Sequence, residues 1–286
     1  MGAGRAVAVR ALALLTAACT VEVDERRVFH PQAETRRLSG GALTLPGEAA
    51  LAQQVVIEHR RLDAPFGPLA VTEARWRTRV GPRRLIVSCG GNATDRLNSG
   101  IHYLTRRLPY GDVQIFDYPG YGDSAGTPSV ADVQAAVKVL AADLRAQGVT
   151  GAVAWGHSLG GFVCAALVRE APEVFGAAVI EASAPNAQAV GRALVPGWLR
   201  PFVRVRASEA VATYDVPALL EGFRGPVLVI GAGADRVLPV ALSRDLAAAL
   251  KTRGPAATYV ELPGAGHQDP GAHPDHAPAV RAFLNL

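Results

Sequence analysis

The run AVAWGHSLGGFVC at residues 152–164 combines a strand pattern, a turn and a helix pattern. Its first four residues are apolar and suit a buried β-strand, and an apolar helical run begins at Gly161. Between them Ser158 is flanked by Gly156 and Gly160, which permit a tight strand-to-helix turn with the serine exposed in a strained conformation. Free N–H groups at the start of the helix point at any anion formed beside Ser158. This context predicts a nucleophilic serine.

Two later loops supply partners for this serine. A serine hydroxyl needs a base, and the base needs an acid that fixes its tautomer. Asp235 follows an apolar strand pattern at residues 226–230, and His267 follows another at residues 257–262. The carboxyl ends of parallel strands meet at one edge of a sheet, where ligands bind. We therefore predict a triad of Ser158, Asp235 and His267, in the chain order that is typical of this turn.

Strand and helix patterns alternate along most of the chain. An antiparallel hairpin is expected from residues 53–62 and 69–77, joined by a turn at residues 65–68. Buried strands are then expected at residues 84–88, 113–116, 152–155, 177–181, 226–230 and 257–262. Ser129 with an acid three residues later predicts a helix start, and Gly148 is expected to end that helix. The alternation predicts the α/β class, with a mostly parallel, doubly wound sheet and helices on both faces.

Residues 186–224 interrupt this alternation, because they place 39 residues between two expected strands. Connections of this kind usually have about 2–6 residues. We expect a small helical cap over the site, with an ordinary helical insertion as the alternative. The stretch carries four large apolar side chains that we expect to line a substrate pocket, namely Leu194, Trp198, Leu199 and Phe202.

The N-terminus resembles a bacterial lipoprotein signal. Arg5 and Arg10 come first, the small and apolar run ALALLTAA follows at residues 11–18, and Cys19 comes next. This pattern predicts a signal peptide at residues 1–18, lipid anchoring through Cys19 and a place in the cell envelope, periplasmic or membrane-associated. The alternative is an N-terminal helix of a cytoplasmic protein. Residues 19–49 are expected to form an N-terminal extension and residues 50–286 the folded domain.

Composition excludes several classes of protein. The chain of 286 residues is 49% hydrophobic and 19% charged, which rules out disorder, collagen-like repeats and coiled coil. The net charge is +4 and no basic stripe is present, so we expect no nucleic-acid partner. Cys19, Cys89 and Cys164 match no metal-binding or CxxC spacing. Because three cysteines cannot form a complete set of internal disulfides, we do not expect disulfides to hold this fold together.

Three further histidines are weaker candidates for the site. His157 lies in the turn itself and is expected to pack beside it. His273 and His276 flank Pro274, which disfavours a helical metal-binding pair, and no third ligand has a recognisable spacing. We therefore expect both to be solvated and predict no metal site.

Residues 50–286 resemble the α/β-hydrolase superfamily. Beyond the turn at residues 156–161, the likeness is carried by CGGNA at residues 89–93 and DYPGYGDS at residues 117–124. The chain looks most like the small-capped branch that contains lysophospholipase-like, serine-aminopeptidase-like and membrane-associated acyl-hydrolase domains. The resemblance implies an oxyanion hole formed by the backbone N–H groups of Asn92 and Leu159. Gly90 stands where the family usually has a His, which keeps the backbone donor but removes a side chain that orders the loop.

These observations predict an acyl hydrolase that cleaves a carboxylic ester or thioester through an acyl-enzyme, with no metal or organic cofactor. The expected substrate is a small or lipid-like acyl compound. One alternative is a serine peptidase or acyltransferase that uses the same triad. Another is a catalytically silent lipoprotein whose hydrolase-like fold serves for binding, although intact Ser158, Asp235 and His267 argue against it.

Overall fold

The computed structural model describes residues 19–31, 54–78, 84–97 and 99–286. The expected signal peptide at residues 1–18 and residues 32–49 of the expected extension therefore lie outside the described residues. Within the described ranges, none of the helices combines the length and the apolar character needed to span a membrane.

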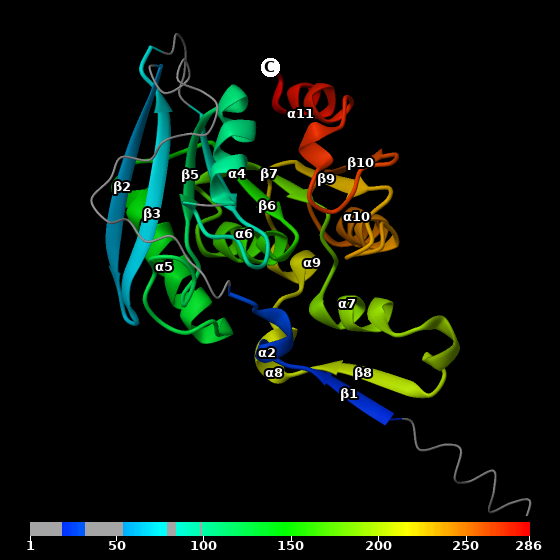
Figure 1. Ribbon diagram of the computed structural model, residues 1–286. Coiled ribbons are helices and arrows are strands. Elements are labelled where there is room, and N and C mark those ends of the chain that lie inside the picture. Colours follow the sequence, from blue (N-terminus) through cyan, green and yellow to red (C-terminus); the bar gives the residue numbers. More distant parts are fainter. Residues whose placement is uncertain (1–18, 32–53, 79–83, 98) are drawn as a thin grey trace, which may run out of the picture.

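An eight-stranded sheet forms the centre of the fold (Figure 1). The strand order is β10-β9-β7-β6-β4-β5-β3-β2, and all neighbours are parallel except that β3 runs antiparallel to β5 and β2. The strands are β2 (Val55–Ala64), β3 (Gly67–Trp76), β4 (Leu85–Cys89), β5 (Asp112–Phe116), β6 (Ala152–His157), β7 (Phe175–Glu181), β9 (Val227–Ala232) and β10 (Ala257–Leu262). Each strand expected from the sequence is present, with ends shifted by at most two residues. The predicted α/β class is confirmed.

Both faces of the sheet are buried, because successive side chains of a strand point to opposite faces. On β4, Val87 packs into one hydrophobic core and Ile86 into the other. The first core is covered by α5 (Val130–Ala146), α6 (Leu159–Glu170) and α10 (Ala241–Arg253). The second is covered by α4 (Gly100–Arg107) and α11 (His276–Leu284). The two cores fix the strand ends that carry the polar residues predicted above.

The ends of α5 agree with the sequence prediction. The Ser129 side chain accepts a hydrogen bond from the Asp132 backbone N–H at 3.1 Å, as a helix-capping residue does. Gly148 follows the helix with φ of +67°, a conformation that favours glycine.

The cap is built from two separate parts of the chain. Its main part comprises α7 (Ala187–Leu194), a 3₁₀ turn (Gly197–Leu199), β8 (Val203–Ala207), α8 (Glu209–Ala212) and α9 (Val216–Leu219). Its second part is β1 (Cys19–Val23), which pairs with β8 in parallel over all five residues, followed by α2 (Glu25–Val28). Figure 1 shows β1 and β8 side by side below the main sheet.

Two sequence expectations about the cap therefore need correction. The cap is not purely helical, because it contains a two-stranded sheet in which β8 pairs with β1. Residues 19–31 are also not a simple extension of the domain, since they form part of this cap. Gly191 allows α7 to lie close to the strand pair, because a Cβ there would come within 2.7 Å of both Val23 and Val205.

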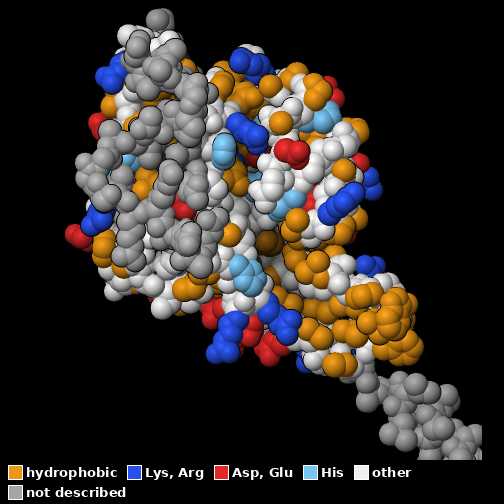
Figure 2. All heavy atoms as spheres, in the orientation of Figure 1, with side chains coloured by type: hydrophobic (Ala, Val, Ile, Leu, Met, Phe, Trp, Pro, Cys, Tyr) orange, Lys and Arg blue, Asp and Glu red, His pale blue; other side chains and the backbone are white. Residues whose placement is uncertain are grey.

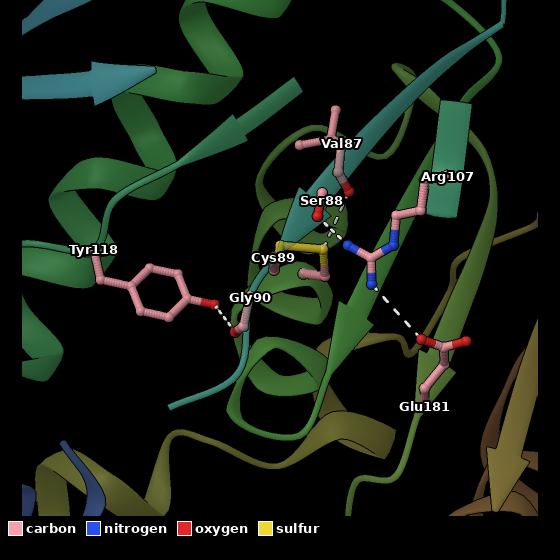
Figure 3. The surroundings of a disulfide bond; sticks show 8 residues. Val87, Ser88, Cys89, Gly90, Arg107, Tyr118 and Glu181 are labelled. Atoms are coloured by element: carbon pink, nitrogen blue, oxygen red, sulfur yellow. Dashed lines mark hydrogen bonds and ion pairs between the residues drawn. A yellow bond between two sulfur atoms is a disulfide. The ribbon is translucent and has the colours of Figure 1, made fainter. Parts of the chain in front are cut away.

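A disulfide joins Cys89, at the end of β4, to Cys164 in α6 (Figure 3). Both cysteines are buried, and 75 residues separate them in the sequence. The expectation that disulfides play no part in holding the fold was wrong. Pairing two of three cysteines leaves Cys19 free and exposed, and only the packing of α6 on β4 brings the other two together.

We expect one reactive thiol in the unreduced protein. After oxidative folding and denaturation without reductant, an alkylating reagent should label only Cys19, and after reduction it should label all three cysteines. The double variant Cys89→Ala/Cys164→Ala should lose about 2–5 kcal/mol of unfolding free energy, because its unfolded chain is no longer cross-linked. Mass spectrometry and guanidinium unfolding measure these effects, with Cys19→Ser as the control of unchanged stability. Three thiols before reduction would contradict the pairing.

Candidate active site

Ser158 lies at the turn between β6 and α6, in the conformation that the sequence predicts. Its φ of +54° is in the left-handed region, which is rare for a residue with a side chain. Small neighbours make this turn possible: a Cβ at Gly156 would lie 2.3 Å from the Gly160 carbonyl oxygen, and a Cβ at Gly160 would lie 2.0 Å from that of Cys89. The turn is therefore packed directly against the end of β4.

The three predicted triad residues lie together in one hydrogen-bonded chain. His267 Nε2 is 3.0 Å from Ser158 Oγ, and His267 Nδ1 is 2.6 Å from Asp235 Oδ2. Ser158 and His267 are both buried residues, and the Asp235 carboxylate is almost entirely shielded from solvent. The three residues follow β6, β9 and β10, so the shared edge of a parallel sheet brings them together.

Asp235 is held by its own loop. Its Oδ1 accepts hydrogen bonds from the backbone N–H groups of Val237 and Leu238, both at 2.8 Å. The other oxygen, Oδ2, is left for the imidazole of His267. Because the carboxylate accepts at Nδ1, that nitrogen carries a proton and Nε2 of a neutral His267 is free to accept one from Ser158.

Asn92 and Leu159 line the same cavity as Ser158. Within the described part of the chain, no carbonyl accepts a hydrogen bond from either backbone N–H. The Asn92 side chain makes three contacts with other parts of the chain: Oδ1 accepts from the His30 backbone N–H and from the Tyr121 hydroxyl, both at 2.9 Å, and Nδ2 donates to the Val28 carbonyl at 2.8 Å. These contacts order the loop without the histidine that Gly90 replaces.

The cavity beside Ser158 has a volume of about 790 Å³ and is mostly apolar. Its walls come from the turn, from α7, from β8 and, unexpectedly, from the N-terminal segment. The apolar side chains that line it include Val21, Val23, Val28, Leu159, Phe162, Val190, Leu194, Val195, Val205 and Leu238. The main polar groups are those of Arg26, Arg27, His30, Asn92, His157, Ser158, His267 and Gln268.

Three of the four residues predicted to line the pocket do not reach it. Leu194 does line the cavity, but Trp198, Leu199 and Phe202 lie outside it. The 3₁₀ turn after Pro196 carries this part of the chain to the outer tip of the cap, where the Trp198 side chain is 75% exposed. The places expected for them are taken by Val190 and Val205 of the cap and by Val21 and Val23 of β1.

His157 packs beside the turn, as expected, but it also contacts the loop of His267. Its Nε2 is 2.7 Å from the His267 carbonyl oxygen, and its Nδ1 is 2.9 Å from the Tyr103 hydroxyl. A carbonyl can only accept, so Nε2 carries the proton and Nδ1 accepts from Tyr103. Burial and the nearby His267 lower the pKa of His157 to about 4, which keeps it neutral.

A buried ion-pair cluster lies behind this contact and corrects the expectation for His276. His276 is not solvated: it is buried, and its Nε2 is 2.6 Å from Glu181 Oε1. Arg107 Nη2 lies 3.7 Å from Glu181 Oε2. Figure 3 marks this ion pair with a dashed line. The Arg107 guanidinium also covers the rings of Tyr103 and Trp155. Burial disfavours the charge of Glu181, but His276 and Arg107 outweigh it and lower its pKa to about 2.

His273 is half-buried and lies 3.0 Å from the Pro263 carbonyl oxygen. Among the residues that the structure describes, no three His, Cys, Asp or Glu side chains form a group that could hold a metal ion.

The part that residues 19–31 play in the cavity was not predicted from the sequence. A signal for it was present, because CTVEV at residues 19–23 and VRVRA at residues 203–207 both alternate between apolar and polar residues, as half-buried strands do. Their pairing could not be predicted from the sequence, because some 180 residues separate the two segments. The local sequence of a strand also says little about which residues of another strand it pairs with.

The low pKa of His157 predicts how stability changes with pH. In the unfolded chain this histidine has a pKa near 6.5, so the unfolded state binds an extra proton between about pH 4 and 6.5. This histidine should not lower the free energy of unfolding above pH 6.5. As the pH drops from 6.5 to about 4, it should lower that free energy by about 3 kcal/mol. Glu181 stops stabilising the folded state only below about pH 4.5, which is a separate pH range.

Urea unfolding of wild type and His157→Asn from pH 4 to 8 measures this effect, with exposed His102→Asn as the matched control. The wild-type curve should slope more steeply than that of His157→Asn, and the control should follow wild type. Parallel curves for wild type and His157→Asn would contradict a neutral, buried His157.

Comparison with known proteins identifies the fold and the family of this chain. Residues 120–285 match the model of the prolyl oligopeptidase family. An uncharacterized protein of Mycobacterium tuberculosis is 33% identical over 199 residues, and an α/β-hydrolase domain-containing protein of Arabidopsis thaliana is 27% identical over 194 residues. These matches cover 66% and 63% of this chain, and 64% and 61% of the length of the two relatives.

Solved structures with the same fold include two archaeal esterases. The Pyrobaculum calidifontis esterase has a TM-score of 0.58 at 23% identity, with 80% of this chain and 83% of that chain covered. The Pyrococcus furiosus esterase has a TM-score of 0.63 at 15% identity, with 90% and 98% covered. The chain thus has the α/β-hydrolase fold and belongs to the prolyl oligopeptidase family.

Proposed function

We propose that this protein is a serine hydrolase that cleaves carboxylic esters or thioesters through an acyl-enzyme. The observation that carries the proposal is the hydrogen-bonded chain from Ser158 through His267 to Asp235, which opens onto a mostly apolar cavity. The finer likeness to lysophospholipase-like and membrane-associated acyl hydrolases agrees with this apolar lining.

The proposed reaction begins when Ser158 Oγ attacks the carbonyl carbon and its proton moves to His267 Nε2. Asp235 Oδ2 stabilises the resulting imidazolium through Nδ1. The backbone N–H groups of Asn92 and Leu159 donate to the oxyanion, an effect worth about 3–4 kcal/mol for a single donor in a comparable site. His267 then protonates the leaving alcohol or thiol. Water, deprotonated by the same histidine, cleaves the acyl-enzyme.

The cavity lining favours acyl chains over peptides. A buried CH₂ group contributes about 0.8 kcal/mol to binding in an apolar pocket, so kcat/KM should rise with acyl length until the cavity is full. A serine peptidase is the second candidate, because the family whose model matches this chain is named for oligopeptidases. The two candidates differ in the leaving group, since one releases an alcohol or thiol and the other an amine.

Cell-envelope location is part of the proposal, with a cytoplasmic location as the alternative. The Cys89–Cys164 disulfide supports export, because such bonds persist in oxidising compartments and are rare in the cytosol. The exposed Cys19 at the start of β1 is accessible for lipidation. Thiol titration of the protein isolated from its own host distinguishes the two locations.

Ser158→Ala should reduce the hydrolysis of p-nitrophenyl esters by at least about a thousandfold, because the acyl-enzyme can no longer form. The melting temperature should stay the same or rise slightly, since alanine leaves the packing of the turn intact. The measurement is kcat/KM for esters from acetate to palmitate and for aminoacyl anilides. Unchanged hydrolysis by Ser158→Ala would contradict the triad, and a preference for anilides would favour the peptidase.

Narrowing the cavity from β1 should shorten the acyl chains that the enzyme prefers. In Val21→Trp the larger side chain fills space at the N-terminal wall, so kcat/KM should fall by about tenfold for long acyl esters and little for acetate. Thr20→Trp is the matched control, because Thr20 is the neighbouring exposed residue and does not line the cavity. Equal chain-length profiles for the two variants would contradict the role of β1.

A further inference from the structure

The outer end of the cap exposes large hydrophobic side chains. Leu194 is 64% exposed, Trp198 75% and Phe202 52%. Figure 2 shows hydrophobic side chains gathered over this end of the molecule, at the lower right. We call these three residues the cap tip. Single exposed apolar residues are common on protein surfaces, but a contiguous group of them marks an interaction site.

The segment that carries the cap tip is held in place by its own hydrogen bonds. Arg200 Nε donates to the Val195 carbonyl at 3.1 Å, and its Nη2 donates to the Ala193 carbonyl at 3.3 Å. The Phe202 backbone N–H donates to the Leu199 carbonyl at 2.9 Å. These bonds fix the turn after α7, so the apolar side chains are presented to solvent by an ordered segment.

The charge of this region favours an anionic partner. Residues 186–207 contain four arginines and no aspartate or glutamate, and the paired strand β1 adds one acid, Glu22, which lies opposite Arg206. Arg204 and Arg206 are exposed on β8, the strand that begins next to Phe202. An apolar group beside a cluster of arginines is the combination that binds the interface of a bilayer containing anionic lipids.

The cap tip is continuous with two other features of the molecule. Leu194 belongs both to the cap tip and to the cavity lining, so the cavity lies directly behind it. The Cys19 backbone N–H donates to the Phe202 carbonyl at 3.0 Å, so Cys19 lies beside the cap tip. Cys19 itself is exposed there.

From these observations we infer that the cap tip docks on the surface of an anionic lipid bilayer. Trp198 and Phe202 enter the interface, and Arg204 and Arg206 contact lipid head groups. The cavity behind Leu194 then faces the membrane. Docking does not depend on the proposed ester hydrolysis, so each can fail without the other. The competing occupants of this surface are a second copy of the chain and residues 1–18.

The test uses the full chain with Cys19→Ser in every arm, so that no lipid anchor contributes and residues 1–18 stay constant. The probes are vesicles of phosphatidylcholine alone and with about 30% phosphatidylglycerol. The test variants are Trp198→Ser/Phe202→Ser and Arg204→Gln/Arg206→Gln. Leu286→Ser is the matched control, because Leu286 is an equally exposed apolar residue at the C-terminus, far from the cap (Figure 1).

We expect the parent chain and Leu286→Ser to sediment with the anionic vesicles. The aromatic double variant should bind at least about tenfold more weakly, and the arginine variant should lose the preference for phosphatidylglycerol. Hydrolysis of a water-soluble ester and the melting temperature should stay unchanged in both variants, since none of the four residues lines the cavity. These controls separate loss of docking from loss of folding.

Fluorescence identifies the docking face. Trp155 is buried and Trp76 is half-buried, so a blue shift on vesicle binding reports Trp198. Trp198→Phe should keep vesicle binding and lose the shift. Three results would overturn the proposal: equal binding by the aromatic double variant, binding without a shift in the parent chain, and a dimer in solution that the aromatic substitutions dissociate.

Discussion

Ser158 can adopt its left-handed backbone conformation only because Gly156 and Gly160 have no side chains. Their absence lets β6 and α6 lie in direct contact with the end of β4. A strained residue persists where the surrounding structure over-determines it. Here that surrounding structure includes the two-sided core beneath the turn and the disulfide from Cys89 to Cys164, which joins β4 to α6. Asn92 and Leu159, the proposed oxyanion donors, line the cavity beside the serine.

His267 depends on a second set of constraints. Asp235 binds one side of its ring, and neutral His157 binds its backbone carbonyl. His157 is held in turn by Tyr103, and beyond Tyr103 lie Arg107 and Glu181. A loop histidine is thereby fixed by groups from α4, β6 and β7. This arrangement explains how a residue on a long loop can stay within 3.0 Å of Ser158.

The sheet and the proximity of Ser158, Asp235 and His267 could be predicted because each rests on a local pattern. Apolar runs that end in glycine or in a polar residue mark the ends of parallel strands, and strand ends gather at one edge. The disulfide, the buried His276 and the β1–β8 pair could not be predicted, because each joins segments far apart in the chain. Trp198 and Phe202 were assigned to the pocket from their hydrophobicity, which does not say which way a turn carries a side chain. The cap thus differs from its prediction far more than the sheet does.

The position of a covalent adduct tells directly whether Ser158 is the nucleophile. The protein is treated with a fluorophosphonate, which reacts with an activated serine, then digested and analysed by tandem mass spectrometry. We expect a single modified residue, Ser158, and no adduct in the His267→Ala variant. An adduct on another residue, or none at all, in a protein that hydrolyses esters would contradict the role of Ser158 as nucleophile.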